Sequence, residues 1–158
     1  MSIAFLGLGS NIDPEENIAS AVRVIGADFS RAWFSPWYRS PAVGMEGSAF
    51  INLVAGVDTG LHPLELKQYL HVLENQHNRD RNVPRWSSRT LDVDILLYDD
   101  LYLVSPELEI PRKEILTMVH VLQPLADIAG EIVHPVKHRR IAQLWNEFKA
   151  TNPALDPL

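Results

Sequence analysis

The segment from Arg85 to Leu96 contains the residues best suited to chemistry, in the order Arg-Trp-Ser-Ser-Arg-Thr-Leu-Asp-Val-Asp-Ile-Leu. Asp92 and Asp94 are two residues apart, and alternate side chains of a β-strand share one face. The two carboxylates would lie about 7 Å apart along that face, where they repel each other unless a cation lies between them. Oxygen ligands without a nearby His or Cys favour Mg²⁺, which binds one or two carboxylates together with substrate phosphates. The opposite face is predicted to carry Leu91, Val93, Ile95 and Leu97.

Positive charge is concentrated just before this strand. Four arginines lie within eleven residues, although the formal net charge of the chain is −6. Guanidinium groups match phosphate oxygens in geometry and charge. The carboxylate pair and the arginine cluster together predict phosphoryl or pyrophosphoryl transfer, in which positioning and charge neutralisation supply most of the catalysis. A solvated basic loop beside a polar strand face is the alternative that the residues alone leave open. The arginines are Arg79, Arg81, Arg85 and Arg89.

Composition narrows the class of protein further. The acidic balance argues against a nucleic-acid binder, and the lack of cysteine excludes disulfides and thiolate metal sites. The glycine-containing segment 7–11 matches neither a Walker A loop nor a dinucleotide-binding fingerprint. The first apolar stretch stops at Asn11, too short for a signal peptide or a membrane span. We therefore expect a cytoplasmic protein that acts on small molecules, with no nucleic-acid or membrane partner.

The elements that position these residues follow from hydrophobic periodicity and from helix and turn signals. A length of 158 residues suits one domain, which we expect to span residues 1–158. The order strand, helix, strand, strand, helix, strand predicts an α+β fold with a ferredoxin-like βαββαβ core. Pro36 marks an edge or a bulge within the second strand. Two more helical segments, one ending at 129–130 and one over 138–150, form a C-terminal extension and complete three αβα layers. The core segments are 2–8, 13–26, 29–39, 50–58, 62–78 and 91–98.

Several motifs, in order and over nearly the whole chain, resemble the 6-hydroxymethyl-7,8-dihydropterin pyrophosphokinase family of folate biosynthesis. The resemblance implies a ferredoxin-like fold and transfer of pyrophosphate from Mg-ATP to the hydroxymethyl group of a reduced pterin, with release of AMP. It also implies a monomer or a homodimer. The matching segments are Gly9-Ser10-Asn11, Tyr38-Arg39-Ser40-Pro41, Phe50-Ile51-Asn52, Glu74 with Arg79 and Arg81, Arg85-Trp86 through Leu96, Pro111, and Leu122-Gln123-Pro124-Leu125.

The resemblance also implies residue roles. Asp92 and Asp94 would hold two Mg²⁺ ions that bridge the ATP phosphates, and Arg79 and Arg89 would complete the catalytic set. Asn52 would hydrogen-bond the pterin ring. The implied ATP site consists of Glu74, Arg79, Arg81, Trp86, Arg89 and Arg112. The implied pterin site consists of Ser40, Pro41, Ala42, Val43, Phe50, Asn52, Asp92 and His120.

For some of these residues, a purely structural role without substrate contact is an alternative. Phe50 could be a core residue, Glu74 a surface residue of its helix, and His120 an ordinary half-buried histidine. Trp86 could anchor its loop without touching substrate. Segment 9–11 is expected to shape a turn rather than touch substrate.

The chain departs from the family pattern in the second half of the site. Arg112 stands where the family usually has a histidine after proline, and Met118 stands where some members carry an arginine. His120 replaces a phenylalanine that can lie over the pterin, and Ser87 replaces a smaller residue. These departures leave two alternatives to the enzyme: a family paralogue that acts on a modified pterin, and a non-catalytic protein that binds nucleotide or pterin.

Overall fold

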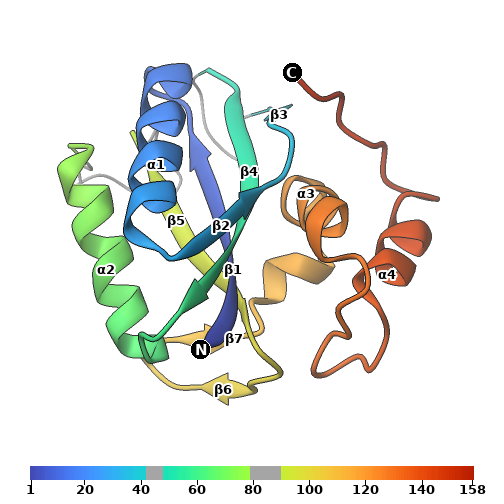
Figure 1. Cartoon of the computed structure of the whole chain (residues 1–158). Coiled ribbons are helices and arrows are strands. Elements are labelled where there is room, and N and C mark those ends of the chain that lie inside the picture. The colour runs from blue at the N-terminus through green and yellow to red at the C-terminus, as the bar shows by residue number, and fades with distance from the viewer. Residues whose placement is uncertain (42–47, 79–89) are drawn as a thin grey trace.

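The computed structural model describes residues 1–41, 48–78 and 90–158 (Figure 1). The sheet is antiparallel, with strand order β2-β4-β1-β5 and with β3 also paired to β4. This is the strand order of the predicted ferredoxin-like core, so the predicted fold class is confirmed. The elements are β1 (Ser2–Ser10), α1 (Pro14–Asp28), β2 (Arg31–Phe34), β3 (Tyr38–Ser40), β4 (Phe50–Thr59), α2 (Pro63–Gln76), β5 (Asp92–Tyr98), β6 (Leu103–Val104), β7 (Glu109–Ile110), the short 3₁₀ helix η1 (Lys113–Leu116), α3 (Val119–Ala129) and α4 (Ile141–Phe148).

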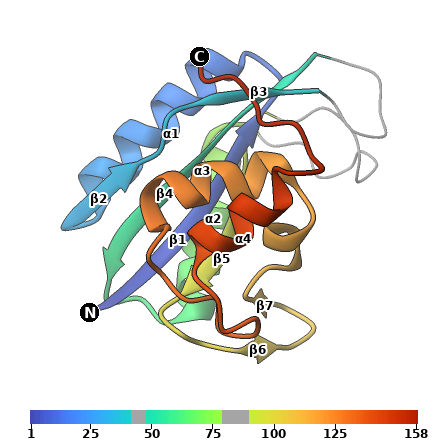
Figure 2. The same ribbon diagram turned by 90° about the vertical axis from the view of Figure 1, so that its right-hand side faces the viewer.

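The sheet separates two apolar cores. Helices α1 and α2 cover one face, and α3 and α4 cover the other (Figures 1 and 2). Alternation along β1 supplies both cores, because Leu6 and Leu8 point toward α1 and α2 while Phe5 packs with the residues of α3. The helical spacing in α4 predicts one inward face: Ile141 is fully buried, and Leu144, Trp145 and Phe148 are partly buried against the same core. The predicted three-layer αβα arrangement is therefore confirmed.

The segment predicted as one strand over 29–39 forms two short strands instead. Between β2 and β3, the Ser35 N–H donates to the Val54 carbonyl at 2.9 Å, and the Ser35 hydroxyl accepts from the Val54 N–H at 2.9 Å. Pro36 has no N–H to continue the ladder. The expected irregularity at Pro36 is confirmed, but a continuous strand is wrong.

β5 carries a bulge that the alternating pattern does not reveal. Phe5 pairs with Leu97 and Leu6 pairs with Ile95, so Leu96 is an extra residue in β5. Leu97 consequently packs with the α3 and α4 core, and the prediction that it shares the face of Ile95 is wrong. Asp92 and Asp94 precede the bulge and keep the common face that was predicted.

Helix α1 begins at Pro14 as predicted, yet its ends differ in detail. Asp13 adopts a left-handed φ of 44°, and its side chain makes no capping hydrogen bond. The helix also continues through Gly26 to Asp28, so the predicted stop at Gly26 is wrong.

Among the described residues, no helix is both long and apolar enough to cross a bilayer.

Candidate active site

One row of residues crosses the sheet at the end of β1. Tyr38 pairs with Asn52, Asn52 with Gly9, and Gly9 with Asp92. Because alternate residues share a face, Gly9 and Asn52 point to the same side as Phe5 and Val54, which pack into the α3 and α4 core. The proposed pterin amide and the first proposed metal ligand therefore lie on one face, separated by a single strand.

Gly9 leaves the space that this arrangement needs. A Cβ atom on Gly9 would lie 2.9 Å from Asn52 Oδ1 and 3.7 Å from Phe50 Cδ1. Gly9 and Ser10 belong to β1, so the expectation that they only shape a turn is wrong. A glycine inside a strand pattern signals a close approach of this kind, and that signal was present in the sequence.

The Asn52 side of the row is polar and buried. Asn52 is buried, and its Nδ2 donates to the buried Ser40 Oγ at 2.6 Å. Phe50 is half-buried, and neither buried core cluster of the described residues includes it, so the plain core reading of Phe50 is not supported. Pro41 is exposed at the edge of the described chain. Ser40, Phe50 and Asn52 are thus brought together as expected for a small planar ligand.

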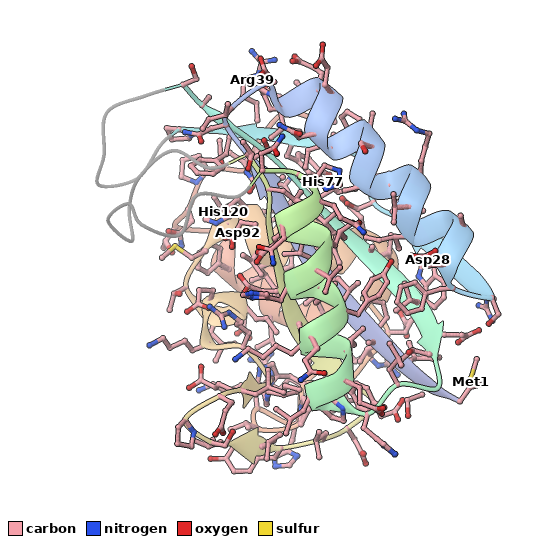
Figure 3. All side chains as sticks on the ribbon, turned by 90° about the vertical axis from the view of Figure 1, so that its left-hand side faces the viewer. Met1, Asp28, Arg39, His77, Asp92 and His120 are labelled. Carbon is pink, nitrogen blue, oxygen red and sulfur yellow. The ribbon has the colours of Figure 1, made fainter. Side chains whose placement is uncertain are left out.

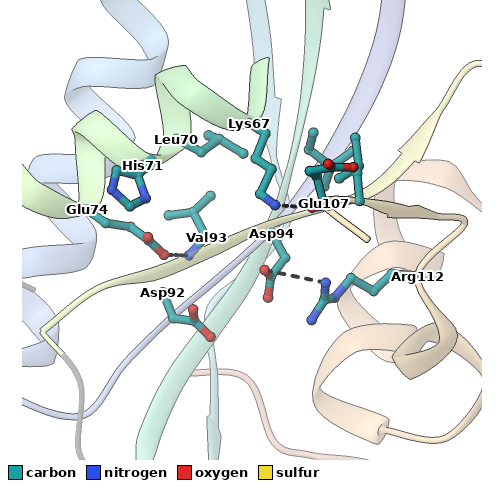
Figure 4. Close-up of a pocket in the computed structure, with 11 residues that line it drawn as sticks. Lys67, Leu70, His71, Glu74, Asp92, Val93, Asp94, Glu107 and Arg112 are labelled. Atoms are coloured by element: carbon teal, nitrogen blue, oxygen red, sulfur yellow. Dashed lines mark hydrogen bonds and ion pairs between the residues drawn. The ribbon is translucent and has the colours of Figure 1, made fainter. Parts of the chain in front are cut away.

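On the acidic side of the row, one guanidinium group pairs with two carboxylates. Arg112 Nη1 lies 3.8 Å from Asp94 Oδ1, and Arg112 Nε lies 2.8 Å from Glu114 Oε2 (Figure 4). The Arg112 N–H donates to the Leu96 carbonyl at 3.0 Å, which ties this residue to β5 at the bulge. Burial, followed by the nearby charge of Asp92, raises the pKa of Asp94 to about 7, and Arg112 partly opposes this rise. Sequence reasoning missed the contribution of Glu114, whose only signal was its spacing of two from Arg112.

Glu74 closes the acidic side from α2. It is 7% exposed, and its Oε2 accepts from the Val93 N–H at 2.9 Å. The surface reading of Glu74 is therefore wrong. A cavity of about 240 Å³ runs from Asp92 and Asp94 past Glu74 toward Lys67, whose Nζ donates to the Glu107 carbonyl (Figure 4). This cavity offers both charge signs to a ligand.

His120 reaches the row from the start of α3. It is half-buried and lies beside Asp92 (Figure 3). Burial lowers the pKa of His120, while the charges of Asp92 and Glu114 oppose that shift. The imidazole ring is flat, which suits the stacking role expected of it.

The remaining predicted site residues lie outside the described residues, so their positions stay predictions. Within the described ranges, no group of three or more His, Asp or Glu side chains is arranged to hold a metal ion. The Asp92 and Asp94 pair still fits Mg²⁺, since that ion commonly takes one or two carboxylates and completes its shell with phosphate and water. The residues outside the description are Ala42, Val43, Arg79, Arg81, Trp86 and Arg89.

The fold and the site are typical of an α+β phosphotransferase, with paired carboxylates and a guanidinium beside a polar pocket. Residues 5–130 match the family model described as 7,8-dihydro-6-hydroxymethylpterin-pyrophosphokinase (HPPK). The chain belongs to this family, as the resemblance of its motifs predicted. Pyrophosphoryl transfer in folate biosynthesis, with ATP as co-substrate, is the activity that this family supports, and the paralogue and binding-only alternatives are not favoured.

Individual relatives agree over most of the chain. The 2-amino-4-hydroxy-6-hydroxymethyldihydropteridine pyrophosphokinase of Synechocystis sp. is 36% identical over 153 residues, which are 94% of this chain and 77% of that protein. The protein of the same name from Haemophilus influenzae is 34% identical over 152 residues and is covered to 94%, as is this chain. The Bifunctional protein FolKE of Lactococcus lactis is 36% identical over 132 residues, but this chain spans only 38% of its length.

The fold has counterparts among solved structures. The wild-type HPPK-DHPS of Plasmodium falciparum superimposes with a TM-score of 0.73 at 16% identity. The match covers 94% of this chain and 41% of that longer chain. At this identity the likeness shows the shared fold alone.

Proposed function

We propose that this chain is a cytoplasmic enzyme that transfers pyrophosphate from Mg-ATP to 6-hydroxymethyl-7,8-dihydropterin and releases AMP, and that residues 1–158 form one domain for this reaction. Family membership supports the chemistry. The observation that carries the proposal for this chain is the row across the sheet, in which Asn52 and Asp92 flank Gly9. A pterin held at Asn52 would present its hydroxymethyl group toward the carboxylates.

The acidic pair would organise the phosphates. Asp92 and Asp94 would hold two Mg²⁺ ions, which when bound neutralise and orient the ATP phosphates. A cation there would also relieve the repulsion that, together with burial, raises the pKa of Asp94. Arg112, already 3.8 Å from Asp94, would turn its donors toward phosphate oxygens once that charge is neutralised. The same ATP site would include Glu74, Arg79, Arg81, Trp86 and Arg89.

The polar side of the row would bind the pterin. The buried Asn52 amide has donor and acceptor atoms that match the edge of a pterin ring. Phe50 and His120 would line the two faces of the ring. The backbone of 40–43 would read the remaining edge, because main-chain N–H and C=O groups fix the orientation of small planar ligands.

The chemical step needs position more than proton transfer. The hydroxymethyl oxygen forms a bond to the β-phosphorus of ATP, the bond between that phosphorus and the α-phosphate oxygen breaks, and AMP leaves. The hydroxyl proton is lost to solvent as the product forms. The described residues place no dedicated general base at this point, and in such transfers positioning and charge stabilisation dominate.

The test is AMP formation from ATP with purified protein, Mg²⁺ and 6-hydroxymethyl-7,8-dihydropterin. We expect AMP and pterin pyrophosphate in equal amounts, and neither product when Mg²⁺ or the pterin is omitted. A panel of modified pterins measured under the same conditions separates the paralogue from the proposed enzyme. Tight binding of ATP and pterin in calorimetry without any AMP would contradict the proposal in favour of a binding protein.

A further inference from the structure

The segment Thr151–Leu158 lies against the strand that leads into the proposed pterin site. The Leu158 N–H donates to the Trp37 carbonyl at 2.9 Å, and Pro157 forms an antiparallel bridge with Tyr38. Figures 1 and 2 show this segment passing beside β3. β3 is therefore held between β4 on one side and these last residues on the other.

One buried side chain fixes the segment to α3. Gln123 Oε1 accepts from the Leu155 N–H at 2.7 Å, and Gln123 Nε2 donates to the Leu155 carbonyl at 3.0 Å. Gln123 is 9% exposed. A buried amide is costly to leave unpaired, so both of its groups favour the docked position of Leu155.

The same face of α3 reaches β3 directly. The buried Tyr38 donates its hydroxyl proton to Asp127, four residues beyond Gln123. His120 lies three residues before Gln123, and residues spaced by three or four share a helix face. Burial, followed by the Asp127 hydrogen bond, raises the pKa of Tyr38 to about 12, which keeps this donor protonated. One helix face therefore carries Gln123, Asp127 and His120, the proposed pterin-stacking residue. We call the two hydrogen bonds between Gln123 and Leu155 the clamp.

β3 needs such support because it is short. It has only 3 residues and pairs with β4 alone among the named strands. Ser40, its last residue, provides the acceptor for Asn52 Nδ2 at 2.6 Å. A shift of β3 by a fraction of an ångström would therefore move the partner of the amide that we assign to the pterin.

We propose that Gln123 is a positioning residue for the pterin site: by holding residues 155–158 against Trp37 and Tyr38, it fixes β3 so that Ser40 meets Asn52. The inference rests on the proposed function, since it takes Ser40 and Asn52 as pterin-binding residues. The family match ends at residue 130, so the clamped segment lies beyond the matched residues.

Two variants test the clamp from its two ends. Gln123→Met keeps side-chain length and helix propensity but removes both hydrogen bonds to Leu155. Leu158→Pro removes the N–H that bonds to Trp37 and leaves both hydrogen bonds between Gln123 and Leu155 available. We expect Gln123→Met to raise the KM for the pterin about five-fold, with the KM for ATP unchanged, since each lost hydrogen bond is worth a factor of a few in an equilibrium constant. Leu158→Pro should have a smaller effect in the same direction. The matched control is Asp156→Asn, on an exposed side chain of the same segment, which should change nothing.

A second measurement needs no substrate. Hydrogen exchange of the backbone amides of Tyr38–Ser40 should accelerate in both clamp variants and not in Asp156→Asn. If exchange at β3 and the pterin KM are both unchanged in Gln123→Met, the inference is wrong. Equal increases in the KM values for pterin and ATP would reduce Gln123 to general stability and would also overturn it. If the unaltered protein makes no AMP, the proposed function fails instead, and the exchange data still show whether the clamp holds β3.

Discussion

The Nε of Arg112 lies 2.8 Å from Oε2 of Glu114, while the other end of the same guanidinium faces Asp94. Glu114 is a fixed partner, because it lies in η1 two residues further along the chain. Asp94 is an exchangeable partner, since a metal ion bound to Asp94 would neutralise its charge and free that end of the guanidinium for phosphate oxygens. The ion pair between Arg112 and Glu114 therefore directs the guanidinium toward the position where we place the ATP phosphates.

Arg112→Ala should raise the KM for ATP about ten-fold, which corresponds to the loss of one charge-assisted hydrogen bond. The pterin dissociation constant should stay the same. Lys113→Ala is the matched control, because Lys113 is a neighbouring cation whose side chain is exposed. Steady-state kinetics with each substrate varied in turn provide the measurement. An equal or larger effect of Lys113→Ala would show that the lysine, and not Arg112, supplies the positive charge.

Gly9→Ala should weaken pterin binding. The new Cβ would lie 2.9 Å from Asn52 Oδ1, so the amide has to rotate or shift away from Ser40. Calorimetry should show at least about ten-fold weaker pterin binding, since a displaced buried hydrogen bond costs about 1–3 kcal/mol. Gly26→Ala offers the control, because a Cβ there meets no atom within 4 Å and replaces glycine inside a helix. It should raise the free energy of unfolding by about 0.5–1 kcal/mol without any effect on binding.

Ser40→Ala tests the hydrogen bond from Asn52 separately from the shape of the site. The amide Nδ2 of Asn52 loses its buried acceptor, and we expect the KM for the pterin to rise about five-fold. Ser105→Ala is a suitable control, because the Ser105 hydroxyl also makes a hydrogen bond, to the Leu108 carbonyl, but lies in the connection between β6 and β7. An unchanged pterin KM in Ser40→Ala would mean that Asn52 holds its orientation without Ser40.

Asp94→Asn should reduce kcat by about a hundredfold or more while the fold persists, because one of the two proposed metal ligands is lost. AMP formation at saturating Mg-ATP measures the loss. Asp100→Asn, in the exposed turn after β5, is the control and should keep full activity. Retained activity in Asp94→Asn would remove Asp94 from the metal site.

The metal-free protein should lose stability as the pH rises through the titration of Asp94. The pKa of Asp94 is raised from 3.8 to about 7 in the folded protein, so the folded state binds the proton more tightly than the unfolded chain does. This contribution is fully present below about pH 4 and is lost by about pH 7. The side chain is 39% exposed, so solvent weakens the effect, and we expect a fall in Tm of about 2 °C.

Thermal unfolding of the metal-free protein between pH 5 and pH 8 should show that difference, and Asp94→Asn should lack it. Added Mg²⁺ should reverse the trend at high pH, because the ion binds the ionised carboxylates of the folded state. A Tm difference between Asp94→Asn and the unaltered protein that does not vary with pH would contradict this account.

Local patterns were sufficient to predict much of the fold. Leu66, Leu70 and Leu73 are buried along one face of α2, as their spacing predicts. The alternation around Asp92 and Asp94 correctly placed both carboxylates on one face. These features depend on periodicities within one segment, which the sequence displays directly.

The features that the sequence did not reveal depend on partners far along the chain. The bulge at Leu96 is defined by β1, and the hydroxyl of Ser35 replaces a carbonyl opposite Val54. Neither residue looks unusual in its own segment. The two hydrogen bonds between Gln123 and Leu155 join residues 32 positions apart, and no short motif predicts that contact.

The extra residue in β5 divides that strand into two parts, which present different kinds of side chain toward α3. Before Leu96, the side facing α3 carries the carboxylates; after it, the same side carries Leu97, which anchors the apolar layer beneath α3 and α4. If the strand alternated regularly through Leu96, Leu97 would face α2, and Leu96 alone of the two would reach the layer beneath α3. The added residue thus gives that side of the strand two apolar side chains, Leu96 and Leu97, directly beyond the two carboxylates.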